Sequence, residues 1–98
     1  KSLKCPADTA IFDYDKLQFP LKIRKFKTGD YFYPLGMRGR KKISDFFIDS
    51  KINLKQKNEI WLLTSNNNII WIVGYRTDNR YCVDDKTKRV MKLLIFLP

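Results

Sequence analysis

The sequence predicts a small α+β domain in which a mostly antiparallel β-sheet carries two short helices. Three observations support this fold class. Strand-like runs recur along the chain and are separated by polar turns, one of which contains three consecutive asparagines. Helical apolar spacing is confined to one short stretch, and an asparagine further on is suited to cap a second helix. The length of 98 residues bounds the chain to one domain with a small core.

The first third of the chain contains three extended segments. Thr9–Phe12 predicts a short strand, and Phe19–Phe26 alternates apolar and basic residues as a half-buried strand does. A turn is expected at Thr28–Asp30. Tyr31–Leu35 is extended again, and Pro34 favours an edge position or a strand end there.

Two short helices are expected next. Over residues 42–48, Ile43, Phe46 and Phe47 follow the i, i+3, i+4 spacing of one helix face, so this helix should pack through its phenylalanines. Asn53 is placed to cap a second helix that runs to about residue 58.

The second half predicts a hairpin and its continuation. Ile60–Thr64 and Ile69–Gly74 are β-rich and are joined by an asparagine-rich turn, because asparagine tolerates the left-handed conformation of tight turns. Trp61 and Trp71 lie in these runs, where core packing or a cross-strand pair is a better explanation than stacking on bases.

The last part of the chain is expected to complete the sheet. Tyr81–Val83 and Val90–Leu97 are predicted strands around a polar turn at Asp84–Lys88. The final run does not alternate cleanly, so we expect it to be buried on both faces or to pair centrally. Cys5 and Cys82 lack metal-ligand spacing and are expected to be reduced and structural.

The net charge of +10 is concentrated in one segment. Phe19–Lys57 holds eleven basic and three acidic residues, a surplus of eight positive charges. Such a field predicts a polyanionic partner, and nucleic acid is the commonest one. Acidic protein surfaces and anionic lipid would satisfy the same field, although no long amphipathic basic helix supports the lipid alternative.

The stretch GDYFYPLGMRGRKK, which starts at Gly29, concentrates this charge after an aromatic run. Gly36 and Gly39 allow positive φ or close approach to a ligand. Four cations fall within five residues: Arg38, Arg40, Lys41 and Lys42. We interpret the stretch as an anion-facing loop, with a solvated basic turn as the alternative.

Several classes of function are disfavoured by what the sequence lacks. It has no histidine, and therefore no usual general base, catalytic relay or imidazole metal ligand. It has no Walker loop, dinucleotide fingerprint, nucleophile elbow or SGGxDS-type pyrophosphatase loop. We therefore expect no catalytic residue, no metal site and no cofactor in this chain. With no membrane-spanning run and no signal pattern, it is expected to be soluble and cytoplasmic.

The chain resembles a known family along nearly its whole length, from about Ala7 to Leu93. The stretch PLKIRKFKTGDYFYPLGMRGRKKISDFFIDSKI is similar to the C-terminal domain of bacterial tRNA(Ile)-lysidine synthetases, especially of the Bacteroidetes type. The resemblance continues through NEIWLL, IIWIVGYR and DDKTKRVMKL. The pattern GD-x-F-x-P-L-G-M-x-G-x-K-K is long and irregular, and therefore specific.

The resemblance implies a fold and a function. Residues 1–98 would be a single C-terminal tRNA-binding domain of a larger ligase, similar to a small α+β unit of the phenylalanyl-tRNA synthetase β subunit. The catalytic N-terminal domain, absent from this sequence, would use ATP and magnesium to join lysine to the wobble cytidine of a minor isoleucine tRNA. This domain would be non-catalytic, and it would contact the tRNA near the acceptor stem and the catalytic domain of the same polypeptide.

The family's signature falls on eleven positions: Arg24, Gly29, Asp30, Pro34, Gly36, Met37, Gly39, Lys41, Lys42, Asp45 and Phe47. Asp30 is better explained as a turn-former than as a ligand. Many members carry arginine and proline where this chain has Lys57 and Trp61, and lysine lacks the bidentate fork that arginine offers to phosphate.

Charge and resemblance together predict the site. The RNA-binding residues are expected to be Arg24, Lys25, Lys27, Arg38, Arg40, Lys41, Lys42, Lys55 and Lys57. Gly29, Gly36 and Gly39 are expected to shape the backbone around them. Two alternatives remain open: a structural or docking module that contacts the rest of the enzyme or another protein, and a freestanding RNA-binding protein.

Overall fold

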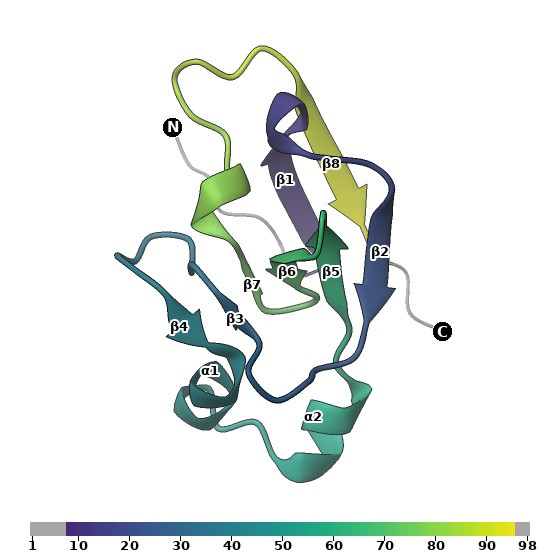
Figure 1. Ribbon diagram of the computed structural model, residues 1–98, viewed down its shortest axis with the longest axis vertical. Coiled ribbons are helices and arrows are strands. Elements are labelled where there is room, and N and C mark those ends of the chain that lie inside the picture. The colour runs from purple at the N-terminus through teal and green to yellow at the C-terminus, as the bar shows by residue number, and fades with distance from the viewer. Residues whose placement is uncertain (1–7, 96–98) are drawn as a thin grey trace.

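The computed structural model describes residues 8–95, in which a central antiparallel sheet lies between two smaller units (Figure 1). The central sheet has the order β2–β5–β6–β7. Its strands are β2 (Leu21–Arg24), β5 (Leu62–Ser65), β6 (Asn68–Ile72) and β7 (Arg76–Thr77). Two further antiparallel pairs are β1 (Thr9–Asp13) with β8 (Val90–Leu94), and β3 (Tyr31–Phe32) with β4 (Lys41–Lys42). The predicted α+β class is confirmed.

Both predicted helices are present. Helix α1 (Ile43–Asp49) buries the three apolar residues whose spacing predicted it. Helix α2 (Leu54–Glu59) starts at a capping box, in which the Asn53 side chain accepts from the Gln56 backbone N–H and the Gln56 side chain accepts from that of Asn53. Two short 3-10 turns, η1 (Tyr14–Lys16) and η2 (Asn79–Tyr81), complete the elements.

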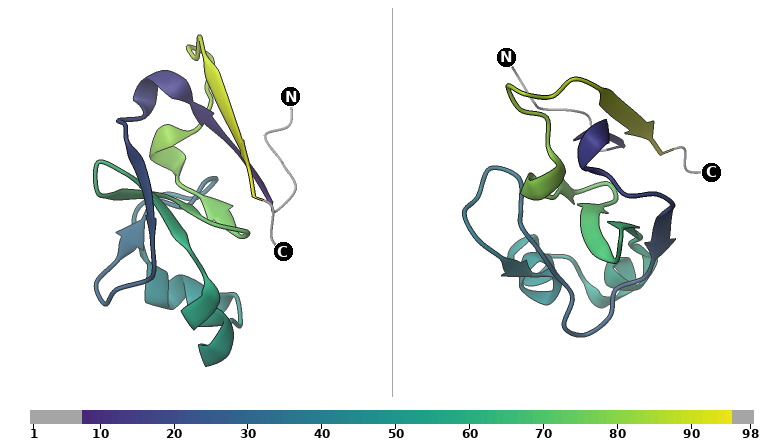
Figure 2. Two further views of the ribbon diagram at one scale, coloured as in Figure 1. Left: turned by 90° about the vertical axis from the view of Figure 1, so that its right-hand side faces the viewer. Right: turned by 45° about the horizontal axis from the view of Figure 1, so that its top comes forward.

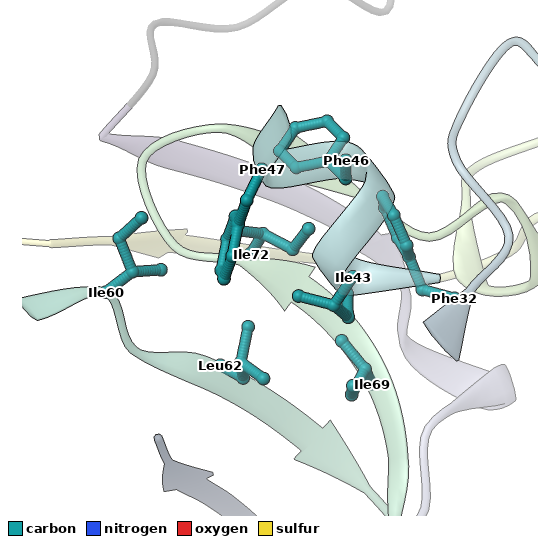
Figure 3. Close-up of a cluster of buried hydrophobic side chains, with 8 residues drawn as sticks. All are labelled: Phe32, Ile43, Phe46, Phe47, Ile60, Leu62, Ile69 and Ile72. Atoms are coloured by element: carbon teal, nitrogen blue, oxygen red, sulfur yellow. The ribbon is translucent and has the colours of Figure 1, made fainter. Parts of the chain in front are cut away.

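One face of the central sheet packs against α1 and β3. Figure 3 shows Phe46 and Phe47 of α1 and Phe32 of β3 lying over Leu62, Ile69 and Ile72 of β5 and β6. Phe32 and Phe46 meet edge to face, with ring centroids 5.5 Å apart. This cluster fixes the position of α1, and therefore of the hairpin that leads into it.

The opposite face packs against the β1–β8 pair. Phe12 of β1 meets Trp71 edge to face at 6.4 Å, and Met91 and Leu93 of β8 pack on the same cluster. Figures 1 and 2 show that β1 and β8 lie at one end of the molecule and the two helices at the other. The first and last described strands thus form one layer.

The β5–β6 hairpin turns as the asparagines predict. Asn66 and Asn67 have φ values of 50° and 68°, the left-handed values that a two-residue hairpin loop requires. The turn at Thr28–Asp30 and the polar turn at Asp84–Lys88 are also present.

Two sequence predictions about strands are wrong. Residues 81–83 do not form a strand, because the buried Asp78 side chain accepts from the Arg80 N–H and starts the 3-10 turn η2 there. β8 is not central, since among residues 8–95 it pairs only with β1, and its outward residues are exposed. Of the predicted run Val90–Leu97, residues 96 and 97 lie outside the described residues, as does Cys5. Cys82 is a half-buried free thiol.

The predicted half-buried strand over residues 19–26 is shorter and more exposed than expected. Leu21 packs on the β1–β8 side, but Ile23, two residues on, is 58% exposed because the covering layer does not reach it. Trp61 is likewise 41% exposed and lies outside β5, so core packing was the wrong explanation for it. Trp71, only 2% exposed, is in the core as predicted.

Candidate nucleic-acid interface

The four clustered cations lie on the β3–β4 hairpin and the loop that closes it. The base of the loop is fixed to the central sheet, because the Leu35 N–H donates to the Thr77 carbonyl at 3.0 Å and Pro34 forms a bridge with Asp78. The loop projects from one side of the molecule, beside α1 (left in Figure 1). Its outer part therefore faces solvent while its two ends are held.

Two glycines set the course of the loop. Gly36 has φ = 83° and Gly39 has φ = 77°, values that residues with a side chain rarely adopt. A Cβ at either position would meet no atom within 4 Å. Their role within the domain is therefore conformational, since close packing does not exclude a side chain. Gly29 takes φ = 95° in the turn before β3.

A groove separates this loop from α1. It encloses about 600 Å³ and is lined by the loop residues Met37–Lys42 together with Asp45, Ile48 and Asp49 of α1. Four cations therefore face two carboxylates. Lys41 forms an ion pair with Asp49, whereas Arg38 and Lys42 are exposed and have no ion-pair partner among residues 8–95. The groove keeps a positive surplus.

Arg40 is held in a different way. Its Cζ lies 4.6 Å from the centre of the Tyr31 ring, on the neighbouring strand. A guanidinium stacked on an aromatic ring is oriented and keeps its N–H groups available to an anion. Arg40 is thus a preorganised cation at the edge of the groove.

A second group of predicted residues surrounds α2. Lys25 donates from Nζ to the Asn58 carbonyl at 2.9 Å and lies 4.1 Å from the Trp61 ring centre. Lys57 lies 5.2 Å from the ring centre of Phe26. Lys27 and Lys55 are exposed. The structure therefore divides the predicted cations into two groups, with α1 between the hairpin loop and α2 (Figure 1).

Arg24 belongs to neither group, because it has an internal partner. Its Nη1 and Nη2 donate to the two carboxylate oxygens of Asp30 at 2.8 and 2.9 Å. Asp30 also accepts from the Lys27 backbone N–H at 2.8 Å, so it organises the turn before β3. Burial works to raise the pKa of Asp30, but the hydrogen bonds from Arg24 and Lys27 outweigh it and hold that pKa below its usual value.

Arg80 and Tyr31 were not among the site residues predicted from the sequence. Arg80 pairs with Asp78, which is fully buried and also accepts from the Tyr33 N–H at 2.9 Å. The Arg80 Cζ lies 4.3 Å from the Tyr33 ring centre. No local pattern indicates this contact, because residues more than forty positions apart are joined by the pairing of Pro34 with Asp78.

None of the helices within residues 8–95 has the length and apolar character needed to cross a bilayer.

Comparison with known proteins gives the family. Residues 21–93 match the TilS substrate C-terminal domain. The chain is 55% identical over 82 residues to a tRNA(Ile)-lysidine synthase of Parabacteroides distasonis, an alignment that covers 84% of this chain and 19% of the relative. It is 48% identical over 84 residues to one of Bacteroides thetaiotaomicron, covering 86% and 20%. The chain thus spans about a fifth of the length of these relatives.

Two solved structures share the fold. A TilS C-terminal domain superposes with a TM-score of 0.75 at 18% identity, over 96% of this chain and 75% of that one. An N-terminal fragment of the phenylalanyl-tRNA synthetase β subunit of Pyrococcus horikoshii gives 0.67 at 18% identity, over 86% and 26%. The family match and the shared fold agree, and this chain belongs to the TilS substrate C-terminal domain family.

Proposed function

We propose that this chain is the C-terminal, non-catalytic domain of a tRNA(Ile)-lysidine synthetase, and that it binds tRNA and positions it for the ligase. The observation that carries the proposal is the groove between the β3–β4 loop and α1, where four cations face two carboxylates. Phosphate groups of an RNA backbone suit such a surface, because Arg and Lys contacts to phosphate release counterions.

Within this proposal, Arg38, Arg40 and Lys42 make the principal phosphate contacts, and Lys41 joins them while paired to Asp49. Lys25, Lys27, Lys55 and Lys57 form an outlying contact on the other side of α1. Arg24 acts mainly on the shape of the turn through Asp30. Contacts of this kind position an RNA duplex without reading its sequence, which suits recognition of the acceptor stem by shape.

The rest of the reaction belongs to other parts of the proposed enzyme. ATP and magnesium would be bound by its catalytic domain, which would join lysine to the wobble cytidine while this domain holds the tRNA. The place of action would be the cytoplasm, with tRNA and the catalytic domain as the partners.

A salt titration tests the binding role. The chain should bind tRNA transcripts measurably at 50 mM salt and progressively less towards 200 mM, because each neutralised phosphate adds to the slope of log K against log salt. Fluorescence anisotropy with labelled tRNA gives the slope, and a polyanion such as heparin should compete. An affinity that does not change with salt, or no binding at 50 mM, would contradict the proposal.

A second function is favoured by one observation. Val90 and Leu94 on the outer face of β8 are 56% and 50% exposed, far from the hairpin loop (Figure 1). Exposed apolar residues on one strand suit docking against the catalytic domain of the same polypeptide. If docking is the main role, V90S/L94S in the full-length enzyme should loosen the domain in small-angle scattering and leave tRNA affinity of the isolated chain unchanged.

A further inference from the structure

Two phenol rings, Tyr31 and Tyr33, lie beside the hairpin in a row between the guanidinium groups of Arg40 and Arg80. Of these four residues only Arg40 also lines the phosphate groove. Arg40 covers Tyr31, the rings of Tyr31 and Tyr33 meet edge to face with centroids 6.2 Å apart, and Arg80 covers Tyr33. Tyr31 is 40% exposed, although it is held between its neighbours. The row therefore presents rigid planar surface to solvent at little entropic cost.

A small pocket beside this row is lined by Tyr31 and Arg80. It measures about 100 Å³, room for about three water molecules, and is therefore suited to the edge of one planar ring. Its lining comes from separate parts of the fold: Arg24, Gly29, Asp30, Tyr31, Asn67, Asn68, Ile69 and Arg80. The turn before β3, the β5–β6 turn and η2 build the pocket, and the fold of the domain fixes the positions of all three.

The pocket is polar but carries no net charge. Arg24 is paired with Asp30, and Arg80 with the buried Asp78, so each cation has its own carboxylate. A phosphate would gain little there, in contrast to the groove beyond Tyr31. A neutral ligand with hydrogen-bonding edges meets complementary groups, since the Asn67 amide and the Arg80 Nη1 make no hydrogen bond within residues 8–95.

We propose that this pocket and the exposed part of the Tyr31 side chain receive one unpaired nucleobase of a bound RNA, whose phosphates lie on the adjacent hairpin cations. Unpaired bases are recognised by stacking on aromatic rings and guanidinium planes and by hydrogen bonds to their edges. Tyr31 serves both regions, because it lines the pocket and supports Arg40 of the groove. This inference deepens the proposed function and rests on it.

The test compares RNA duplexes that differ at one end. A blunt 12-base-pair duplex, the same duplex with two unpaired nucleotides, and a third with an abasic overhang are titrated with the chain. The unpaired bases should raise affinity by about ten-fold over the blunt duplex, as expected for one stacked base, while the abasic overhang should add little. 2-Aminopurine placed in the overhang should lose fluorescence on binding, because stacking quenches it.

Three variants assign the effect to the pocket. Y31L should abolish most of the overhang advantage and the quenching, whereas Y31F should retain both because the ring remains. N67G should reduce the advantage without disturbing the turn, since glycine accepts its φ of 68°. R38A should weaken binding of blunt and overhang duplexes equally. Thermal melts check that each variant is folded.

Each outcome bears on a different claim. Equal, salt-dependent affinity for blunt and overhang duplexes would overturn the nucleobase site and leave the proposed function standing. An equal advantage from the abasic overhang, or an advantage unchanged in Y31L, would overturn it as well. No binding of any RNA would overturn the proposed function, and the nucleobase site with it.

Discussion

The two ends of the molecule carry the same kinds of charged residue and use them in opposite ways. At the β1–β8 end, residues 8–16 and 84–95 hold five basic and five acidic residues. Lys16 donates to Asp84 at 2.8 Å, and Arg89 pairs with Asp15. Around the hairpin loop, residues 36–49 hold four basic residues and two acidic ones, so a positive surplus remains, and among residues 8–95 only Lys41 of the four has an ion-pair partner. The location of the acidic residues, more than the number of basic ones, therefore determines where the positive surplus lies, which is the surface that we propose binds tRNA.

Each end also has a buried aspartate that anchors a loop. Replacing these two aspartates should give the largest difference in effect between the two ends. D78A removes the acceptor of the Tyr33 N–H and leaves Arg80 without its ion-pair partner. This should cost about 3 kcal/mol of unfolding free energy, or about 12–24 °C in Tm. It should also weaken RNA binding by the folded protein. D13A removes the acceptor of the Asp15 N–H and the Thr87 hydroxyl, and should destabilise the fold while leaving affinity unchanged.

Thermal denaturation and RNA titration below the melting range measure both quantities. Equal loss of affinity in D78A and D13A would show that binding follows global stability and not the hairpin.

Two matched charge deletions should differ in RNA affinity. R38A/R40A/K41A/K42A and K86A/K88A/R89A/K92A each remove four positive charges, so long-range attraction falls by a similar amount. The hairpin variant should lose about 100-fold in affinity for tRNA and two to three units of salt slope, because its contacts are direct. The control variant should lose no more than about three-fold. Anisotropy titrations at several salt concentrations measure both affinities. Similar losses of affinity in the two variants would mean that net charge alone drives binding.

A single glycine tests whether the loop must be preshaped. G36A should cost about 1 kcal/mol, because alanine resists the φ of 83°, and should weaken tRNA binding by several fold. G36N should come close to the wild-type protein in both respects, since asparagine tolerates this conformation. Urea denaturation and tRNA titration of the two variants provide the comparison. Loss of affinity in G36N equal to that in G36A would point to contact with the glycine itself.

The smallest effect concerns acid. The folded-state pKa of Asp30 lies below its usual value of 3.8, so the carboxylate contributes stability at neutral pH. This contribution is complete above pH 3.8 and is lost as the pH falls through the lower folded-state pKa. D30N should be less stable than wild type at pH 7, and the difference in unfolding free energy should shrink as the pH falls below 3.8. Denaturant melts across pH 2–7 measure the difference, and a constant difference would exclude the linkage.

Local patterns in the sequence predicted the elements that local physics controls. Helix α1 was predicted from Ile43, Phe46 and Phe47, because a helix of that spacing has one apolar face. The start of α2 was predicted from Asn53, because its side chain caps the helix. Asn66 and Asn67 gave the hairpin because they tolerate positive φ. The clustering of the loop cations is visible in the sequence because all four fall within five residues.

Predictions failed where the deciding contact is distant in sequence. The 3-10 turn at residues 79–81 depends on Asp78, whose burial comes from pairing with the β3 segment. Ile23 and Trp61 are exposed because the β1–β8 layer stops short of them, and no local pattern records the extent of a covering layer. Arg40 and Arg80 are distant in sequence, and only the fold brings them to the same pair of tyrosine rings, Tyr31 and Tyr33.

The β1–β8 pair has a mechanical consequence. Thr9, where β1 begins, is the register partner of Leu94, where β8 ends, so the two strands run antiparallel from a shared end. Tension applied at these two residues is borne by one hydrogen bond at a time, as in opening a zipper, instead of by all of them at once as in shear. A pull on the domain through these ends would therefore peel off β1 and β8 at low force, while the hairpin and its groove stay folded on the central sheet.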